Sequence, residues 1–149
     1  MSCSAKRFEL LGKMADSVTA DLCINNVQQL MKKIVFITGA SSGIARETAI
    51  QLARHGYTVY GVARRKDKLG NLSSQGVHIL KMDVTDDHSI INGIQEIMAA
   101  ERRIDILINN AGFGSYGSIE DVPLEEARYQ LEVNLFGAAR LIQLVLPTP

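Results

Sequence analysis

Residues 34–45 read IVFITGASSGIA, an apolar run followed directly by a turn rich in glycine and serine. An unbroken apolar run such as 34–37 is typical of a strand that is covered on both faces. Apolar side chains at helical spacing then predict a helix over 42–55, with Ile44 on its apolar side and Gly56 as its stop. The stretch therefore predicts a strand, a tight turn and a helix in direct succession.

The same alternation continues along the chain. Further strands are predicted over 58–63, 77–82 and 104–108, with a short helix over 66–72 and a helix N-capped by Thr85. A long helix is predicted to have Pro123 in its first turn and to be ended by Pro147. Its expected buried side is Leu124, Ala127, Leu131, Leu135, Ala138, Ile142 and Val145. Strands that alternate with helices predict an α/β, Rossmann-like, doubly wound parallel sheet in the order 3-2-1-4.

The turn after the first strand has the composition of a phosphate-binding turn. Gly39 and Gly43 allow a tight reversal and a close approach of backbone to a diphosphate, and Ala45 takes the third small position. The helix N-terminus then offers free N–H groups and a partial positive charge. We predict a dinucleotide site that uses Gly39, Ser41, Ser42, Gly43 and Ile44, with a purely structural turn as the alternative.

The pattern Thr38-Gly39-x-x-x-Gly43-Ile44, followed by Asn-Asn-Ala-Gly at 109–112, resembles the short-chain dehydrogenase/reductase family. The three-residue gap between the glycines is similar to the oxidoreductase subgroup, although Ala45 stands where that subgroup usually has glycine. The resemblance covers residues 33–149, the N-terminal half of a usual member. It implies an oxidoreductase that transfers hydride between a nicotinamide cofactor and a small carbonyl or alcohol substrate.

Arg64 bears on the choice of cofactor. Ala63 occupies the position after the second strand where an acidic residue usually accepts from the ribose hydroxyls of NAD, and Arg64 follows it. A guanidinium can bind a phosphate with two hydrogen bonds, each worth about 1.5–3 kcal/mol, or about 10- to 150-fold in preference. We therefore predict NADP(H) over NAD(H). The alternative is that Arg64 and Arg65 only solvate a loop.

The resemblance also implies roles for residues nearer the other strands. Asp83 would accept from the adenine amino group, and Val84 would pack on the adenine ring. The loop with Asn110, Ala111 and Gly112 would lie over the cofactor ribose. Asn134, an unfavourable residue inside a helix, matches the family's catalytic asparagine, which holds a water in the proton relay; a surface asparagine is the alternative.

The sequence contains no Tyr-x-x-x-Lys, the pair in which a lysine lowers the pKa of a catalytic phenol. We therefore expect an N-terminal fragment that is inactive alone, with the apolar residues 106–108 of the fourth strand as an exposed edge, and a homo-oligomer when complete. A non-catalytic dinucleotide-binding module or partner subunit is the alternative. A methyltransferase is a more distant alternative.

Composition narrows the remaining possibilities. The chain has 149 residues, with 16 basic and 16 acidic side chains and no basic stripe, so nucleic acid is not an expected partner. No apolar run is long enough to span a membrane. Neither Cys3 nor Cys23 has a Cys or His at metal-ligand spacing, so we interpret both as reduced thiols of a cytoplasmic protein. We expect the Rossmann domain to be residues 31–149. Residues 1–30 would be an irregular or helical extension, or an upstream stretch before a natural start at Met31.

Overall fold

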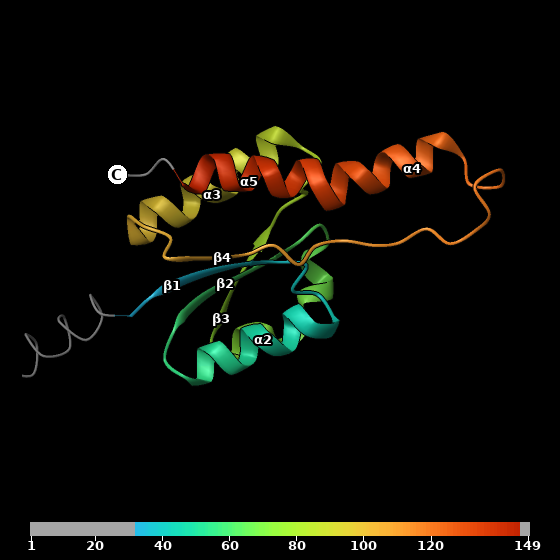
Figure 1. Cartoon of the computed structure of the whole chain (residues 1–149). Coiled ribbons are helices and arrows are strands. Elements are labelled where there is room, and N and C mark those ends of the chain that lie inside the picture. The colour runs from blue at the N-terminus through green and yellow to red at the C-terminus, as the bar shows by residue number, and fades with distance from the viewer. Residues whose placement is uncertain (1–31, 147–149) are drawn as a thin grey trace, which may run out of the picture. The chain divides into compact units, whose positions relative to one another are not determined.

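Four parallel strands form the sheet that organises the chain, in the order β3-β2-β1-β4. The computed structural model describes residues 32–146 (Figure 1). The strands are β1 (Ile34–Thr38), β2 (Thr58–Ala63), β3 (Val77–Lys81) and β4 (Ile106–Ile108). The predicted fold class and strand order 3-2-1-4 are confirmed. The expectations for residues 1–30 and for a start at Met31 lie outside the described residues.

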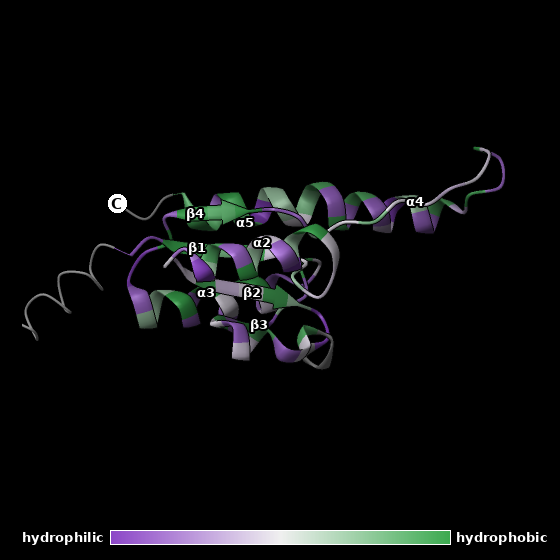
Figure 2. Cartoon of the chain, turned by 90° about the horizontal axis from the view of Figure 1, so that it is seen from below, coloured by the Kyte–Doolittle hydropathy of each residue, from purple (hydrophilic) through white to green (hydrophobic). Residues whose placement is uncertain are grey.

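Helices cover both faces of the sheet, as a doubly wound fold requires (Figure 1). Along β1, Ile34 and Phe36 belong to one buried cluster, while Val35 and Ile37 belong to the other. Helix α2 (Gly43–Arg54) and the 3₁₀ segment η1 (Lys66–Gln75) pack on the second cluster. Helices α3 (Asp87–Glu101) and α5 (Gly137–Val145) pack on the first. The strand alternation thus explains why the apolar run at 34–37 is unbroken. Figure 2 shows that β4 is also mainly hydrophobic.

The helix starts differ from the predicted ones. Thr85 is not the N-cap of α3; that position is taken by Asp86, whose carboxylate accepts from the N–H groups of His88 and Ser89. The reason is that the Thr85 hydroxyl and N–H are both bound by Asp83 Oδ1, at 2.8 and 3.0 Å. Pro123 precedes helix α4 (Leu124–Leu131) with an extended ψ of 137°, so it caps the helix rather than entering its first turn. The predicted helix 66–72 continues to Gln75 across a kink at Gly70.

The predicted long C-terminal helix is interrupted, and four of the seven side chains predicted to be buried are exposed. A π segment, η2 (Glu132–Phe136), separates α4 from α5. In it, Gly137 N–H donates to Glu132 O, the i→i−5 pattern that inserts an extra residue and shifts which side chains face the sheet. Buried positions are therefore Gly137 and Leu141. Four of the expected buried leucines and isoleucines are exposed instead: Leu124, Leu131, Leu135 and Ile142.

Tyr60 joins β2 to the far end of α3. Its hydroxyl donates to Glu101 Oε1 at 2.8 Å, and its ring stacks on His78 of β3 with centroids 4.8 Å apart. Burial raises the pKa of Tyr60 from 10.0 to about 12, helped by the hydrogen bond to Glu101 and by the charges of Glu101 and Glu96. Because folding favours the protonated phenol, Tyr60 stabilises the fold fully below its unfolded pKa. That contribution is lost as pH rises through the folded value.

We predict that tyrosinate absorbance contributed by Tyr60, taken as wild type minus Tyr60→Phe, has a midpoint at a pH of about 12. Between pH 10.0 and about 12 the wild type should also lose more stability than the variant. Glu101→Gln removes a negative charge beside the phenol, so it should lower this midpoint toward the ordinary value. A wild-type midpoint near 10.0 would contradict the prediction.

Candidate functional site

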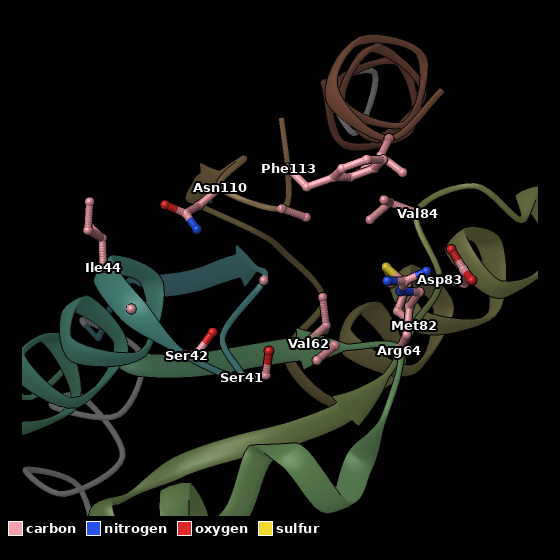
Figure 3. A pocket seen from close by; sticks show the side chains of 16 residues that line it. Ser41, Ser42, Ile44, Val62, Arg64, Met82, Asp83, Val84, Asn110 and Phe113 are labelled. Atoms are coloured by element: carbon pink, nitrogen blue, oxygen red, sulfur yellow. The ribbon is translucent and has the colours of Figure 1, made fainter. Parts of the chain in front are cut away.

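A pocket of about 500 Å³ lies at the carboxyl ends of the strands, where open α/β sheets bind ligands. Figure 3 shows side chains from the ends of β1, β2, β3 and β4 converging on it. It contains every residue predicted to bind the cofactor. Its lining is Gly39, Ser41, Ser42, Gly43, Ile44, Val62, Ala63, Arg64, Met82, Asp83, Val84, Asn110, Ala111, Gly112, Phe113 and Val133.

Gly39 is required by both conformation and space. Its φ of +73° lies in the left-handed region that side chains rarely adopt, and a Cβ on it would stand 3.0 Å from Ala111 Cα. The loop after β4 therefore lies directly on the turn after β1. Gly43 also has a positive φ, +61°, but a Cβ there would meet nothing within 4 Å. Its side faces open space in the pocket.

The N-terminus of helix α2 is open to the pocket. Ser42 occupies the N-cap in an extended conformation, makes no side-chain cap, and no acidic residue lies in the first turn. The first N–H groups of the helix thus keep their capacity to bind an anion. Ile44 does not lie on the buried face expected for it; its side chain is 80% exposed and lines the pocket instead. The buried face of α2 is formed by Ala45, Ala49 and Ile50.

Thr38 holds the two sides of the pocket together. Its side chain is 1% exposed, and its Oγ1 accepts hydrogen bonds of 3.0 Å from the N–H groups of both Asn110 and Ala111. Thr38 belongs to the pattern Thr38-Gly39-x-x-x-Gly43-Ile44, but no role was predicted for its side chain. A polar residue at the end of an otherwise apolar strand was the available signal, because a buried hydroxyl needs a partner.

The ends of β2 and β3 contribute opposite charges. Arg64 follows β2, is exposed, and donates through Nη1 to the hydroxyl of Tyr129 in α4. Asp83 follows β3, and its Oδ1 is engaged by Thr85 within the turn. The Asp83 N–H bonds to the Ser89 hydroxyl at 3.0 Å, which further orders the turn.

Asn134 lies beside the pocket rather than on its lining. It sits in the π segment, and its amide binds both backbone groups of Phe113: Oδ1 accepts from the N–H at 3.1 Å and Nδ2 donates to the carbonyl at 2.8 Å. Gly112 gives room for this contact, because a Cβ on it would stand 3.0 Å from Asn134 Oδ1. The structure thus brings Asn134 to the loop after β4, where its side chain fixes the loop's position.

Close backbone approaches mark two further residues that sequence reasoning missed. A Cβ on Gly137 would stand 2.4 Å from the carbonyl oxygen of Val84. Helix α5 can therefore lie against the segment that follows β3 only with glycine at this position. A Cβ on Gly61 would stand 3.0 Å from Ala40 Cβ. A glycine inside a helix or a strand is the signal for such contacts.

The pocket's residues fit a dinucleotide. Uncapped helical N–H groups suit a diphosphate, Asp83 offers an acceptor, Arg64 a cation, and Val84 and Val133 apolar surface for a base. Within residues 32–146, no cluster of His, Cys, Asp and Glu side chains is arranged to hold a metal ion. The helices of that same part are too short or too polar to cross a membrane.

Comparisons with known proteins agree with this geometry. The family model described as short chain dehydrogenase matches residues 33–148. A curated relative from Helicobacter pylori, named as a probable short-chain type dehydrogenase/reductase VdlC, is 40% identical over 111 residues. That match covers 74% of this chain but 41% of the relative, so the chain spans about two-fifths of its length.

Solved structures are similar over most of the chain. An alcohol dehydrogenase from Thermococcus sibiricus, complexed with 5-hydroxy-NADP, has 31% identity and a TM-score of 0.72 over 78% of this chain and 53% of its own. A 3-ketoacyl-(acyl-carrier-protein) reductase from Brucella melitensis, complexed with NADH, has 26% identity and a TM-score of 0.74. That similarity covers 78% of this chain and 49% of the reductase. Both forms of the cofactor thus occur among similar structures.

We predict that Thr38→Val lowers the free energy of unfolding by about 1–3 kcal/mol, because valine keeps the shape but leaves two N–H groups without their acceptor. Urea unfolding measures this. Thr38→Ser is the matched control, since it keeps the hydroxyl and should lose less. Equal stability of the valine and serine variants would show that the hydrogen bonds carry no net stabilisation.

Proposed function

The chain belongs to the short-chain dehydrogenase family, and from this membership we propose that it binds NADP(H) as the cofactor-binding part of an oxidoreductase. The substrate class would be a small carbonyl or alcohol compound. When bound, the cofactor supplies or accepts hydride, and the protein supplies position and protons. The observation that carries the proposal is the convergence of all predicted cofactor residues on one pocket. We propose residues 31–149 as the dinucleotide-binding domain.

The pocket's residues suggest how the cofactor would be held. The N–H groups at the start of α2, after Gly43, would bind the diphosphate, with Ser41 and Ser42 within the same turn. Asp83 would accept from the adenine amino group while Val84 packs on the ring. The loop of Asn110, Ala111 and Gly112 would lie against the ribose. The fixed position of that loop, through Thr38, supports this arrangement.

Arg64 supports NADP(H) rather than NAD(H). Arg64 lines the pocket at the end of β2. The preceding residue, Ala63, offers no acidic side chain to accept from a 2′-hydroxyl. A guanidinium binds a phosphate through two parallel charge-assisted bonds. We therefore propose that the 2′-phosphate of the cofactor is recognised at this position.

Asn134 is proposed as the residue of this chain that serves proton transfer. Its side chain is engaged with Phe113, so its contribution would depend on the π segment in which its backbone lies. A Tyr-x-x-x-Lys pair does not occur in the sequence, so we propose that these residues alone bind cofactor without turnover. The alternative expected from the sequence is a non-catalytic dinucleotide-binding module or partner subunit. Reading the gene past codon 149 separates the two.

We predict that Arg64→Ala weakens NADP⁺ binding by about 10- to 150-fold, because it removes a charge-assisted contact to the 2′-phosphate. NAD⁺ binding should change little. Calorimetric titration of the purified chain with each nucleotide measures both. Arg65→Ala is the matched control, since Arg65 is exposed and lies outside the pocket lining. Equal or tighter binding of NAD⁺ by the wild type would refute NADP(H) preference.

A further inference from the structure

Tyr129 makes contacts that the proposed function does not explain. Its hydroxyl accepts a hydrogen bond from Nη1 of Arg64, 65 positions earlier in the chain. Its ring lies against Phe113, with centroids 5.6 Å apart and planes at 40°. Arg64 and Phe113 both line the pocket, so Tyr129 connects two of its sides from helix α4.

Helix α4 continues directly into η2 and α5, and two of its side chains connect it to the pocket and to the loop after β4. It contains no buried residue. Besides Tyr129, Gln130 contacts the loop after β4, with its Oε1 accepting from the Ser115 N–H at 2.8 Å. The link from α4 to β2 therefore runs through the pair of Tyr129 and Arg64. A ligand that engages Arg64 would act on this link.

The Arg64 guanidinium has a neutral partner. In the part of the chain that the structure describes, its side chain bonds to the Tyr129 hydroxyl and is in no ion pair. A phosphate is a stronger acceptor than a phenol, because it carries charge and can accept two parallel bonds from one guanidinium. A phosphate bound at Arg64 can therefore replace the Tyr129 hydroxyl as the acceptor of the guanidinium's hydrogen bonds.

We propose that Tyr129 is a specificity-determining residue that sets the strength of the preference for NADP(H) by competing with the 2′-phosphate for Arg64. The proposal rests on the proposed function, since it assumes that Arg64 recognises that phosphate. In the free protein, the hydrogen bond to Tyr129 keeps Arg64 from the ligand for most of the time. The apparent affinity for a 2′-phosphorylated ligand is the intrinsic affinity multiplied by the fraction of Arg64 that is free.

The size of the effect follows from the exposure of the contact. Tyr129 is 38% exposed and Arg64 is exposed, so the bond is a modest one. A net hydrogen bond of this kind corresponds to roughly a two- to fivefold penalty on binding. NAD(H), which has no 2′-phosphate, should not meet this penalty.

The test compares Tyr129→Phe with the wild type in titrations with NADP⁺ and NAD⁺. Phenylalanine keeps the ring against Phe113 and removes only the hydroxyl. We expect roughly two- to fivefold tighter binding of NADP⁺ and no change for NAD⁺. The fragments 2′,5′-ADP and 5′-AMP should repeat the pattern, because they isolate the adenosine end of the cofactor.

Two controls isolate the competition. Tyr116→Phe is the matched change at a tyrosine that is 97% exposed and lies outside the pocket lining, and it should leave both affinities unchanged. In the Arg64→Ala background, adding Tyr129→Phe should have no effect on NADP⁺ binding. An effect of the same size without Arg64 would overturn the proposal.

The remaining outcomes are distinguishable. If Tyr129→Phe leaves NADP⁺ binding unchanged or weakens it, the proposal is overturned; weakening would mean that the hydroxyl itself holds the phosphate. If the wild type prefers NADP⁺ and loses that preference in Arg64→Ala, the proposed function stands whatever Tyr129→Phe does. If the wild type binds neither nucleotide, both the proposed function and this proposal fail.

Discussion

One buried hydroxyl fixes the geometry on which the pocket depends. Thr38 ends β1, and its Oγ1 accepts hydrogen bonds from the N–H groups of Asn110 and Ala111, which follow β4. The backbone after β4 is thereby held against Gly39, where a Cβ would find Ala111 Cα at 3.0 Å. The turn after β1 and the loop after β4 therefore form one unit. Loss of this contact would separate the two sides of the proposed dinucleotide site.

Other contacts extend this unit into the rest of the chain. Asn134 ties Phe113 to the helix that follows, and Gly137 lets that helix lie against the carbonyl of Val84. Arg140 pairs with Asp87, which holds α5 to α3 and keeps the pKa of Asp87 below its ordinary value. The pocket is thus built on packed elements rather than on loops alone. Such preorganisation lowers the entropy that ligand binding has to overcome.

The parts that sequence reasoning predicted are those decided by local chemistry. The strand order follows from alternating apolar runs and amphipathic helices, and the turn at 39–43 follows from glycines in conformations that other residues avoid. The need of Thr38 for a hydrogen-bond partner could be read locally, but the partners could not, because they are 72 and 73 positions away. The buried side of the last helices was missed for a different reason. A π segment at 132–136 shifts the helical phase after it, and α4, which precedes it, buries none of its side chains.

In the proposed function, the turn after β1 and the loop after β4 bind one dinucleotide together. Amide hydrogen exchange of the purified chain, with and without saturating NADPH, reports on both segments at once. We expect NADPH to slow exchange in the first turn of α2, at 43–46, and in the loop at 110–113, and to leave the outer strand β3 unchanged. Unchanged exchange in both segments, with the protein folded, would contradict it.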